Sequence, residues 1–349
     1  MSHELIFFGA FALFIVLMLA LDLGVFHKKD EKVSFKQAAV MSAIWVSFAI
    51  GFYFFLKTEG QELHNISNQA QLEEVVKNHQ HNISVNSANF HENLNKYNDN
   101  LSLEFITGYV IEYALSVDNI FVMVLIFSAF GVDEKYYHRV LFWGILGAVI
   151  MRFIFIFLGA TLISQFGWIL YIFGAFLIYS GFMMFLTKDE EEKIDPENHK
   201  VVKFASRFFP VHPEYVGHDF FHRKSGKLFI TPLFLVLLVI EFSDVIFAVD
   251  SIPAIFAVTK DPYIVFFSNI FAILGLRSMF FLLVNVIHKF HYLKTGLAIL
   301  LMFIGVKMLA HHWLQEWGFT TIHSLFVILG ILTISVVASL AFPKKEVGQ

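Results

Sequence analysis

Nine apolar runs of about 20 residues dominate this 349-residue chain and limit what it can fold into. A helix of that length crosses a ~30 Å hydrocarbon core. Backbone groups must be paired in lipid, and the runs lack the alternation of barrel strands, so helices are expected. The runs lie at 5–26, 37–56, 104–131, 140–163, 167–186, 229–258, 263–287, 293–311 and 321–342. We therefore predict an all-α, polytopic membrane protein of about nine transmembrane helices, with residues 1–349 as a single membrane domain.

The composition agrees with a lipid environment and excludes several classes of protein. Hydrophobic residues make up 57% of the chain and charged residues 15%, against about 45–50% and about 25% in soluble domains. A net charge of -4 without a long basic block argues against nucleic-acid binding. The absence of cysteine leaves oxygen and imidazole as metal ligands. Without a Walker-type loop or a Ser/His/Asp arrangement, we expect neither an enzyme nor a resident cofactor.

Lysine and arginine predict the orientation in the membrane. They concentrate on one set of connections, whereas the other set holds only Lys57, Lys77, Lys96 and Lys260. Because basic connections stay cytoplasmic, we expect the amino terminus outside and the carboxyl terminus inside.

Two connections between the predicted spans are long. The outer one, an insertion at 57–102, is predicted to be a solvated cap or a partly ordered loop. Its histidines, His64, His79, His81 and His91, leave open a cation-gathering surface. The inner loop, 187–228, carries His218 and His222 at helical spacing, which suits zinc but lacks a third ligand. We also expect this inner loop to be the docking surface for any protein partner.

An internal repeat relates spans three to five to spans six to eight. At a spacing of 132 residues, Glu112 and Asp118 fall on Asp244 and Asp250. In the next helix, a spacing of 125 places Arg152 on Arg277, and a weaker match at 124 places Gly181 on Gly305. A unit of three helices reverses direction in the membrane when it is repeated. The sequence therefore predicts an inverted repeat, an architecture of many secondary transporters.

Five carboxylates lie within the predicted spans, where each is costly and therefore a functional candidate. They are Glu112, Asp118, Glu241, Asp244 and Asp250. On a straight helix, Asp244 and Asp250 lie roughly 120° apart. Because Pro253 removes a backbone donor, we expect a helix break at 248–253 that turns both toward one cavity. Glu241 falls on Tyr109 in the repeat and has no acidic equivalent.

We predict that these acids, with Asn119, hold a divalent cation near the middle of the membrane. Oxygen ligands suit Mn²⁺, Ca²⁺ or Mg²⁺. Arg152 and Arg277 are the expected counter-ions, and Asp22, Ser116 and Ser251 are candidates for the pathway. Two other interpretations remain: buried ion pairs that only hold the helices together, and a proton relay.

The chain resembles the TerC/Alx family from the first predicted span to the ninth, and four stretches carry this resemblance. They are IEYALSVDNIF at 111–121, YHRVLFWGILG at 137–147, EFSDVIFAVDSIPAIF at 241–256 and FSNIFAILGLR at 267–277. The resemblance implies a bacterial inner-membrane protein associated with manganese export, with some relatives named for tellurite resistance. It also carries the motif acids over to Glu112, Asp118, Glu241, Asp244 and Asp250. The outer loop is longer and richer in asparagine than the family pattern.

Together these observations predict a secondary transporter that exports divalent cations, most of all Mn²⁺, with proton exchange as a driving reaction. The alternative is a non-conducting membrane scaffold of a metal-stress or tellurium-resistance complex. The expected partners are a divalent metal ion, the lipid bilayer and a protein at the inner loop.

Overall fold

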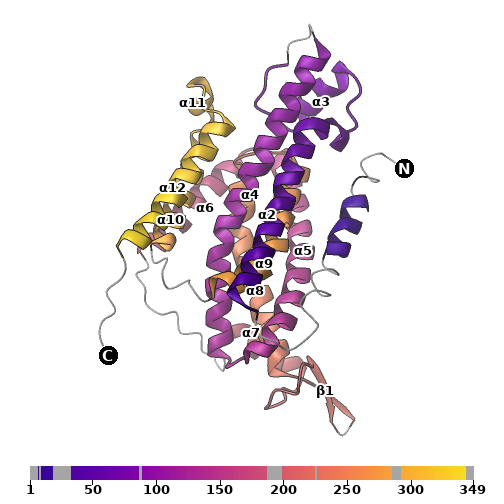
Figure 1. The fold of residues 1–349 in the computed structure, drawn as a ribbon, viewed down its shortest axis with the longest axis vertical. Helices are drawn as coiled ribbons and strands as arrows, with labels where there is room; N and C mark the ends of the chain where they lie inside the picture. The colour runs from indigo at the N-terminus through magenta and orange to yellow at the C-terminus, as the bar shows by residue number, and fades with distance from the viewer. Residues whose placement is uncertain are drawn as a thin grey trace.

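The computed structural model describes residues 7, 9–18, 33–85, 89–186, 199–224, 226–284 and 292–342. Their fold is almost entirely helical (Figure 1). The elements are α2 (Phe35–Glu59), η1 (Gly60–Leu63), α3 (Gln69–Asn78), α4 (Phe90–Ala129), α5 (Glu134–Gln165), α6 (Ile169–Leu186), α7 (Lys200–Phe208), β1 (Phe221–Lys224), β2 (Lys227–Ile230), α8 (Pro232–Phe256), α9 (Pro262–Leu283), α10 (Leu293–Leu309), α11 (His311–Glu316) and α12 (Thr321–Ala341).

Short polar side chains fix where the long helices begin. Asn89 accepts backbone N–H groups at the start of α4, and Asp133 does so for α5. Thr231 and Asp261 each cap a helix whose first residue is proline, a residue that lacks the N–H left unpaired there. Asp261 Oδ1 accepts from the backbone N–H of Tyr263 at 2.9 Å, which leaves its second oxygen for other partners.

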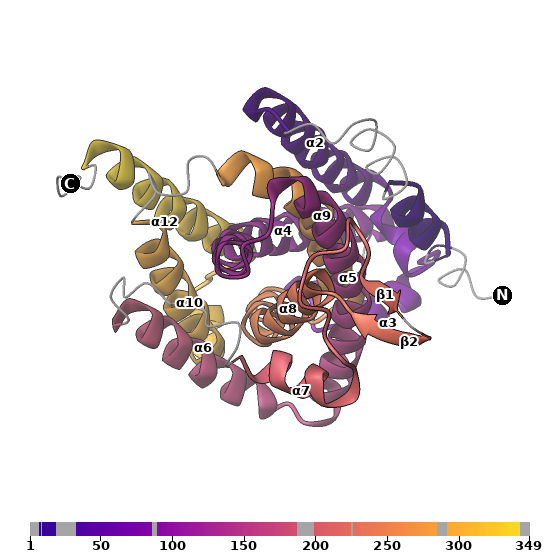
Figure 2. The same cartoon turned by 90° about the horizontal axis from the view of Figure 1, so that it is seen from below.

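Helix α9 lies at the centre of the bundle. Every residue from Ile264 to Phe281 is buried, and α2, α4 and α5 all contact this helix. In the view from below, α4, α5 and α8 lie around it, while α6, α10 and α12 form a group to one side (Figure 2). We call the end of the bundle that carries α3 the α3 end, and the opposite end, with the β1–β2 pair, the hairpin end (Figure 1).

Seven described helices are long and apolar enough to cross a membrane, namely α2, α4, α5, α6, α8, α9 and α12. They match seven of the nine predicted runs and confirm an all-helical polytopic membrane protein. The run at 293–311 is represented by α10, with 17 residues. The run at 5–26 is described only in part and contains the shorter apolar helix Gly9–Met18.

Both long connections contain regular structure in their described parts. Residues 57–102 contain the end of α2, η1, α3 and the first residues of α4, so this segment is more ordered than the predicted loop. In the 187–228 connection, α7 precedes the antiparallel β1–β2 pair. His222 lies on β1, and His218 precedes it outside any helix, so the helical spacing assumed for a zinc site there is wrong.

The helices that the predicted repeat makes equivalent pack against one another. Helix α4 contacts α8 and α9, α5 contacts α8 and α9, and α6 packs along α10. A β-carbon at Gly305 would lie 2.6 Å from the Gly174 carbonyl oxygen, and one at Gly181 would lie 2.6 Å from the Ala298 carbonyl oxygen. Both glycines are therefore required where the α6 and α10 backbones meet.

Candidate functional site

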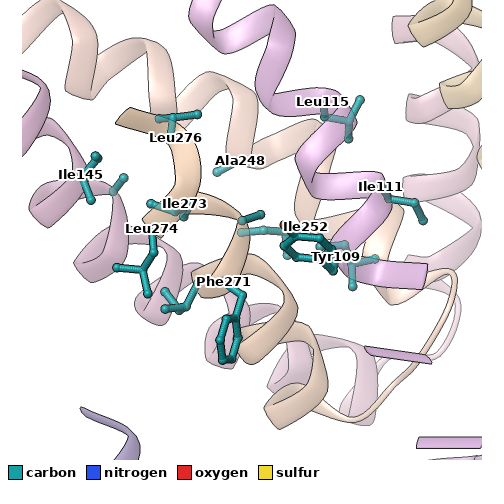
Figure 3. Close-up of a cluster of buried hydrophobic side chains, with 14 of the residues drawn as sticks. Tyr109, Ile111, Leu115, Ile145, Ala248, Ile252, Phe271, Ile273, Leu274 and Leu276 are labelled. Carbon is teal, nitrogen blue, oxygen red and sulfur yellow. The ribbon is translucent and has the colours of Figure 1, made fainter. Parts of the chain in front are cut away.

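A polar cluster lies within the apolar core formed by α4, α5, α8 and α9. We call it the central cluster, and it consists of Glu112, Arg152, Asp244, Ser251 and Asn269. Figure 3 shows apolar side chains of the same helices, such as Ile111 and Leu115 of α4, Ile145 of α5, Ile252 of α8 and Ile273 of α9. The charged groups therefore sit in surroundings that offer little other solvation.

Arg152 contacts both Glu112 and Asp244, the two acids that occupy equivalent positions in the predicted repeat. Its Nη1 pairs with Glu112 Oε1 and donates to Asn269 Oδ1 and, at 3.1 Å, to Ser251 Oγ. Its Nη2 lies 3.3 Å from Asp244 Oδ1. Glu112 and Arg152 are 0% exposed and Asp244 is 5% exposed. The guanidinium thus compensates two buried carboxylates, one from α4 and one from α8.

Each of these acids uses only one of its oxygens in this way. Glu112 Oε2 and Asp244 Oδ2 are buried and make no hydrogen bond within the described part of the chain. An unsatisfied buried polar atom costs about 1–3 kcal/mol. Both atoms are therefore available as ligands for a cation or a water molecule.

Asp250 does not join Asp244 on the central cluster. It accepts a hydrogen bond from Ser180 Oγ of α6 at 2.9 Å. The reason is that α8 continues as a helix through Pro253 to Phe256, so the predicted break at 248–253 is wrong. Without that break, six helical residues place the two aspartates on different faces.

The remaining predicted ligands lie along the same helices. Glu241 is partly buried, and its carboxylate fills the space over Gly147 of α5 that a β-carbon would occupy. Asp118 is partly buried on α4, about 1.7 turns beyond Glu112. Asn119 and Ser116 are buried on that helix, and Ser116 Oγ has no hydrogen-bond partner among the described residues.

The two predicted counter-ions have different surroundings. Arg152 contacts both acids, whereas Arg277 Nη2 donates to His138 Nδ1 of α5 at 2.8 Å. Arg277 is fully buried. Asp22, a predicted pathway residue, lies outside the described residues. Of the predicted set, the structure therefore gathers Glu112, Arg152, Asp244 and Ser251.

Three polar partners of the predicted site residues were missed from the sequence. Asn269 completes the central cluster, Ser180 binds Asp250 and His138 binds Arg277. Asn269 is an amide in an otherwise apolar run and lies eight residues before Arg277. That isolation was a usable signal. Ser180 carries no comparable signal, because serine is common in membrane helices.

A second polar cluster lies at the α3 end. We call it the histidine cluster, and it consists of His64, His79, His81, Glu104 and Asp261. His64 Nε2 lies 2.8 Å from Asp261 Oδ2. His81 Nδ1 lies 3.0 Å from Glu104 Oε2, and Glu104 also accepts from Thr259 Oγ1 at 2.6 Å. The fourth histidine of the 57–102 segment, His91, is exposed on the surface of α4.

Burial and the two carboxylates act in opposite directions on these groups. Burial lowers the pKa of His79, and the nearby Asp261 only partly offsets this effect. Burial would also lower the pKa of His81, but the Glu104 carboxylate and then Asp261 outweigh it, so the pKa of His81 is raised. Burial would raise the pKa of Asp261, but His64, His79 and His81 together lower it. Asp261 is therefore an anion.

The chain is similar to known membrane proteins along most of its length. Residues 97–347 match the model of the family described as "Integral membrane protein TerC family". An "Uncharacterized membrane protein STKORF319" of Myxococcus xanthus is 45% identical over 95% of this chain and 91% of its own length. Proteins named "Putative membrane-bound redox modulator Alx" are 42% identical in Salmonella typhi and 41% identical in Escherichia coli K12. Each alignment covers 94% of this chain and 92% of the relative.

No solved structure matches the chain. The family match covers more than half of the sequence, and the relatives align over nearly all of it. The four stretches that carried the resemblance all lie within the matched region. This chain belongs to the integral membrane protein TerC family.

Proposed function

We propose that this protein is a secondary transporter that exports divalent metal cations, above all Mn²⁺, in exchange for protons. The observation that carries the proposal is the meeting of Glu112 and Asp244 on Arg152 inside the bundle. An aspartate within a membrane helix costs about 2.5–3.5 kcal/mol on insertion scales. Two acids at equivalent repeat positions, brought to one arginine, therefore argue for a function that needs them.

The central cluster offers the ligands and the charge that a divalent ion requires. Glu112, Asp244 and Arg152 sum to a formal charge of -1. Carboxylate oxygens, Asn269 Oδ1 and Ser251 Oγ form an all-oxygen ligand set, which suits Mn²⁺, Ca²⁺ and Mg²⁺. In this proposal the guanidinium occupies the place of the cation and withdraws when the ion binds. The choice of Mn²⁺ rests on the resemblance to the family.

The packing of the helices supports an inverted repeat of α4–α6 and α8–α10. In this repeat α4 corresponds to α8, α5 to α9 and α6 to α10. When each helix is replaced by its counterpart, the α4–α9 contact becomes the α8–α5 contact, which is also present. The α4–α8, α5–α9 and α6–α10 contacts stay the same under this exchange. Inverted repeats place the substrate site at the repeat interface. The central cluster draws its charged residues from both units, as that architecture requires.

The distribution of lysine and arginine supports one orientation. We propose that the α3 end faces outward and the hairpin end faces the cytoplasm of a bacterial inner membrane. The long inner connection 187–228, with α7 and the β1–β2 pair, then lies in the cytoplasm. In this orientation the exported ion leaves through the α3 end.

A non-conducting scaffold is the second candidate. It is favoured by Arg152 itself, because an arginine that already pairs two acids also holds three helices together. The Alx relatives are named as redox modulators. Since this chain has no cysteine, thiol chemistry is not the means by which it would take such a role. The scaffold would use the 187–228 connection as its docking surface.

Uptake of radioactive manganese by liposomes that contain the purified protein separates the two candidates. We expect flux in the wild type and a loss of at least tenfold in Glu112→Gln and Asp244→Asn. Asp118→Asn and Asp250→Asn test the two predicted acids that lie further along α4 and α8. Glu92→Gln, an exposed acid paired with Lys96, is the matched control and should keep full flux. Equal flux in all the folded variants would exclude this mechanism.

A further inference from the structure

The histidine cluster has the composition of a metal site that is separate from the central cluster. We propose that it is a resident site for one divalent transition-metal ion, held by His64, His79 and Asp261 with His81 as a fourth ligand. The proposal does not rest on transport. Such a site would exist equally in a transporter and in a scaffold.

The spacing of the ligand atoms is close to that of a metal site. One ligand atom from each of His64, His79 and Asp261 lies within 4.8 Å of the others. Zinc binds nitrogen at about 2.0–2.1 Å, so two ligands of a tetrahedral ion lie about 3.3 Å apart. Asp261 Oδ2 lies 2.8 Å from His64 Nε2 and 3.9 Å from His81 Nε2. Shifts of roughly 0.5 Å in these two pairs, and of up to about 1.5 Å for His79, would therefore reach coordination distance.

His81 has the orientation of a metal ligand. Its Nδ1 faces the Glu104 carboxylate at 3.0 and 3.1 Å. Its Nε2 points toward Asp261, is buried and makes no hydrogen bond with the described residues. Metal-binding histidines usually give their second ring nitrogen to a carboxylate, which fixes the ring and raises its basicity. Glu104 takes this role, and Asn100 and Thr259 in turn hydrogen-bond to Glu104.

The charge of the cluster calls for a cation. Glu104 and Asp261 are 2% and 0% exposed, and with neutral histidines they contribute a formal charge of -2, of which Lys307 offsets a part by its charge interaction with Glu104. Buried carboxylates without compensation are strongly destabilising. One divalent ion would cancel this charge. The competing explanation is a proton on a histidine, and the experiment below distinguishes the two.

The backbone beside the histidines also adopts an uncommon conformation. Asn65, which follows His64, has a φ of 51°, and Gln80, which lies between His79 and His81, has a φ of 52°. The left-handed region costs roughly 1–2 kcal/mol for a residue other than glycine. At Gln80 this turn aims the two neighbouring imidazoles into one cluster. Lys260 holds the turn by donating to the Gln80 side chain.

The donor set indicates which ions the site prefers. Imidazole suits zinc, cobalt, nickel, copper and iron, whereas carboxylate and carbonyl oxygens suit Mg²⁺, Ca²⁺ and Mn²⁺. Three imidazoles and one carboxylate therefore favour Zn²⁺ and Co²⁺ over Mn²⁺. This preference is the reverse of the one expected for the all-oxygen central cluster.

Metal retention by the full chain in detergent tests the proposal. The protein is stripped with a chelator, incubated with Zn²⁺, Co²⁺ or Mn²⁺, and desalted before elemental analysis. We expect about one Zn²⁺ or Co²⁺ per chain and a visible absorption band from tetrahedral Co²⁺. His64→Ala and His79→Ala should each weaken binding at least tenfold. Glu104→Gln should weaken it about 10- to 100-fold, as for other residues that orient a ligand.

Two controls separate this site from the rest of the molecule. His91→Ala removes a histidine of the same outer segment that is exposed and should retain the ion fully. Glu112→Gln should also retain it while losing manganese flux, so failure of transport and failure of this site are distinguishable.

His79 is only partly buried, so His79→Ala remains informative where a more buried variant does not fold. Wild-type protein that holds no Zn²⁺ or Co²⁺ above the His79→Ala level would overturn the proposal. Retention of Mn²⁺ alone would do the same.

Discussion

The central cluster and the histidine cluster each bury two carboxylates, but they compensate them in different ways. In the central cluster Arg152 supplies a fixed positive charge to Glu112 and Asp244. In the histidine cluster the side chains that hydrogen-bond to Glu104 and Asp261 are histidines, a threonine and an asparagine, and Lys307 acts on Glu104 only through a longer-range charge interaction. The two lie on shared helices, with Glu104 and Glu112 eight residues apart on α4, about 12 Å along its axis. A bound ion must displace a cation at one cluster and can simply enter the other.

Removing Arg152 is expected to have the largest effect. Arg152→Gln leaves two buried carboxylates without a cation, and breaking a buried pair costs about 3–5 kcal/mol. We expect a clear fall in the thermal midpoint measured on the protein in detergent. Lys57→Gln is the control, because Lys57 pairs with Asp99 at the surface, where ion pairs contribute about 0–1 kcal/mol.

A further variant shows whether the loss comes from the uncompensated acids. Glu112→Gln and Asp244→Asn added to Arg152→Gln should recover part of the stability, since no buried charge then remains unpaired. If Arg152→Gln alone is as stable as Lys57→Gln, Arg152 does not supply the compensation described here.

Chelation should act on the other cluster only. If an ion links His64, His79 and His81 to Asp261, its removal frees the segment around η1 and α3. A ligand at 100 times its Kd adds about 2.7 kcal/mol, which corresponds to about a 100-fold change in local opening. Hydrogen exchange should therefore accelerate in residues 60–85. It should stay unchanged around Glu112. Acceleration in both regions would show that the two clusters are not independent.

The smallest effects come from the hydroxyl group beside each cluster. Ser251→Ala removes an acceptor from a guanidinium and should cost about 1.5–3 kcal/mol, as hydrogen bonds to charged groups do. Thr259→Ala removes a donor to Glu104 and should cost less when the metal is bound, because an ion on His81 strengthens the hydrogen bond that its Nδ1–H gives to Glu104. Denaturant unfolding of both variants, with and without a chelator, measures the two costs as changes in the free energy of unfolding. An equal chelator effect on both variants would contradict the difference between the clusters.

The sequence was sufficient to predict the charged framework but not its geometry. The apolar runs predicted the long helices, because lipid leaves the backbone few alternatives. The repeat identified Glu112, Asp244 and Arg152, because charges in apolar runs stand out. The prediction that a helix break turns Asp250 toward Asp244 was wrong. The effect of Pro253 on α8 depends on neighbouring helices that the sequence does not show.

The histidine cluster shows a second limit of sequence reasoning. His64, His79 and His81 were noticed together, but their carboxylate partner Asp261 lies 197 residues from His64 in the chain. Within its own surroundings, Asp261 resembles an ordinary helix cap before a proline. Only the folding of the 57–102 segment over the α8–α9 turn reveals that the second oxygen of Asp261 faces the histidines.

The glycine contacts between α6 and α10 have a consequence for the origin of the chain. At the spacing of 124 residues, Gly181 corresponds to Gly305 and Gly174 corresponds to Ala298. Gly174 meets Gly305, and Gly181 meets Ala298, so each contact is the exchanged copy of the other. A surface on which i meets j and j meets i is an isologous interface, the form found in homodimers. The α6–α10 contact therefore has the pattern that the predicted inverted repeat requires, as expected of two identical ancestral subunits inserted in opposite directions and later joined into one polypeptide.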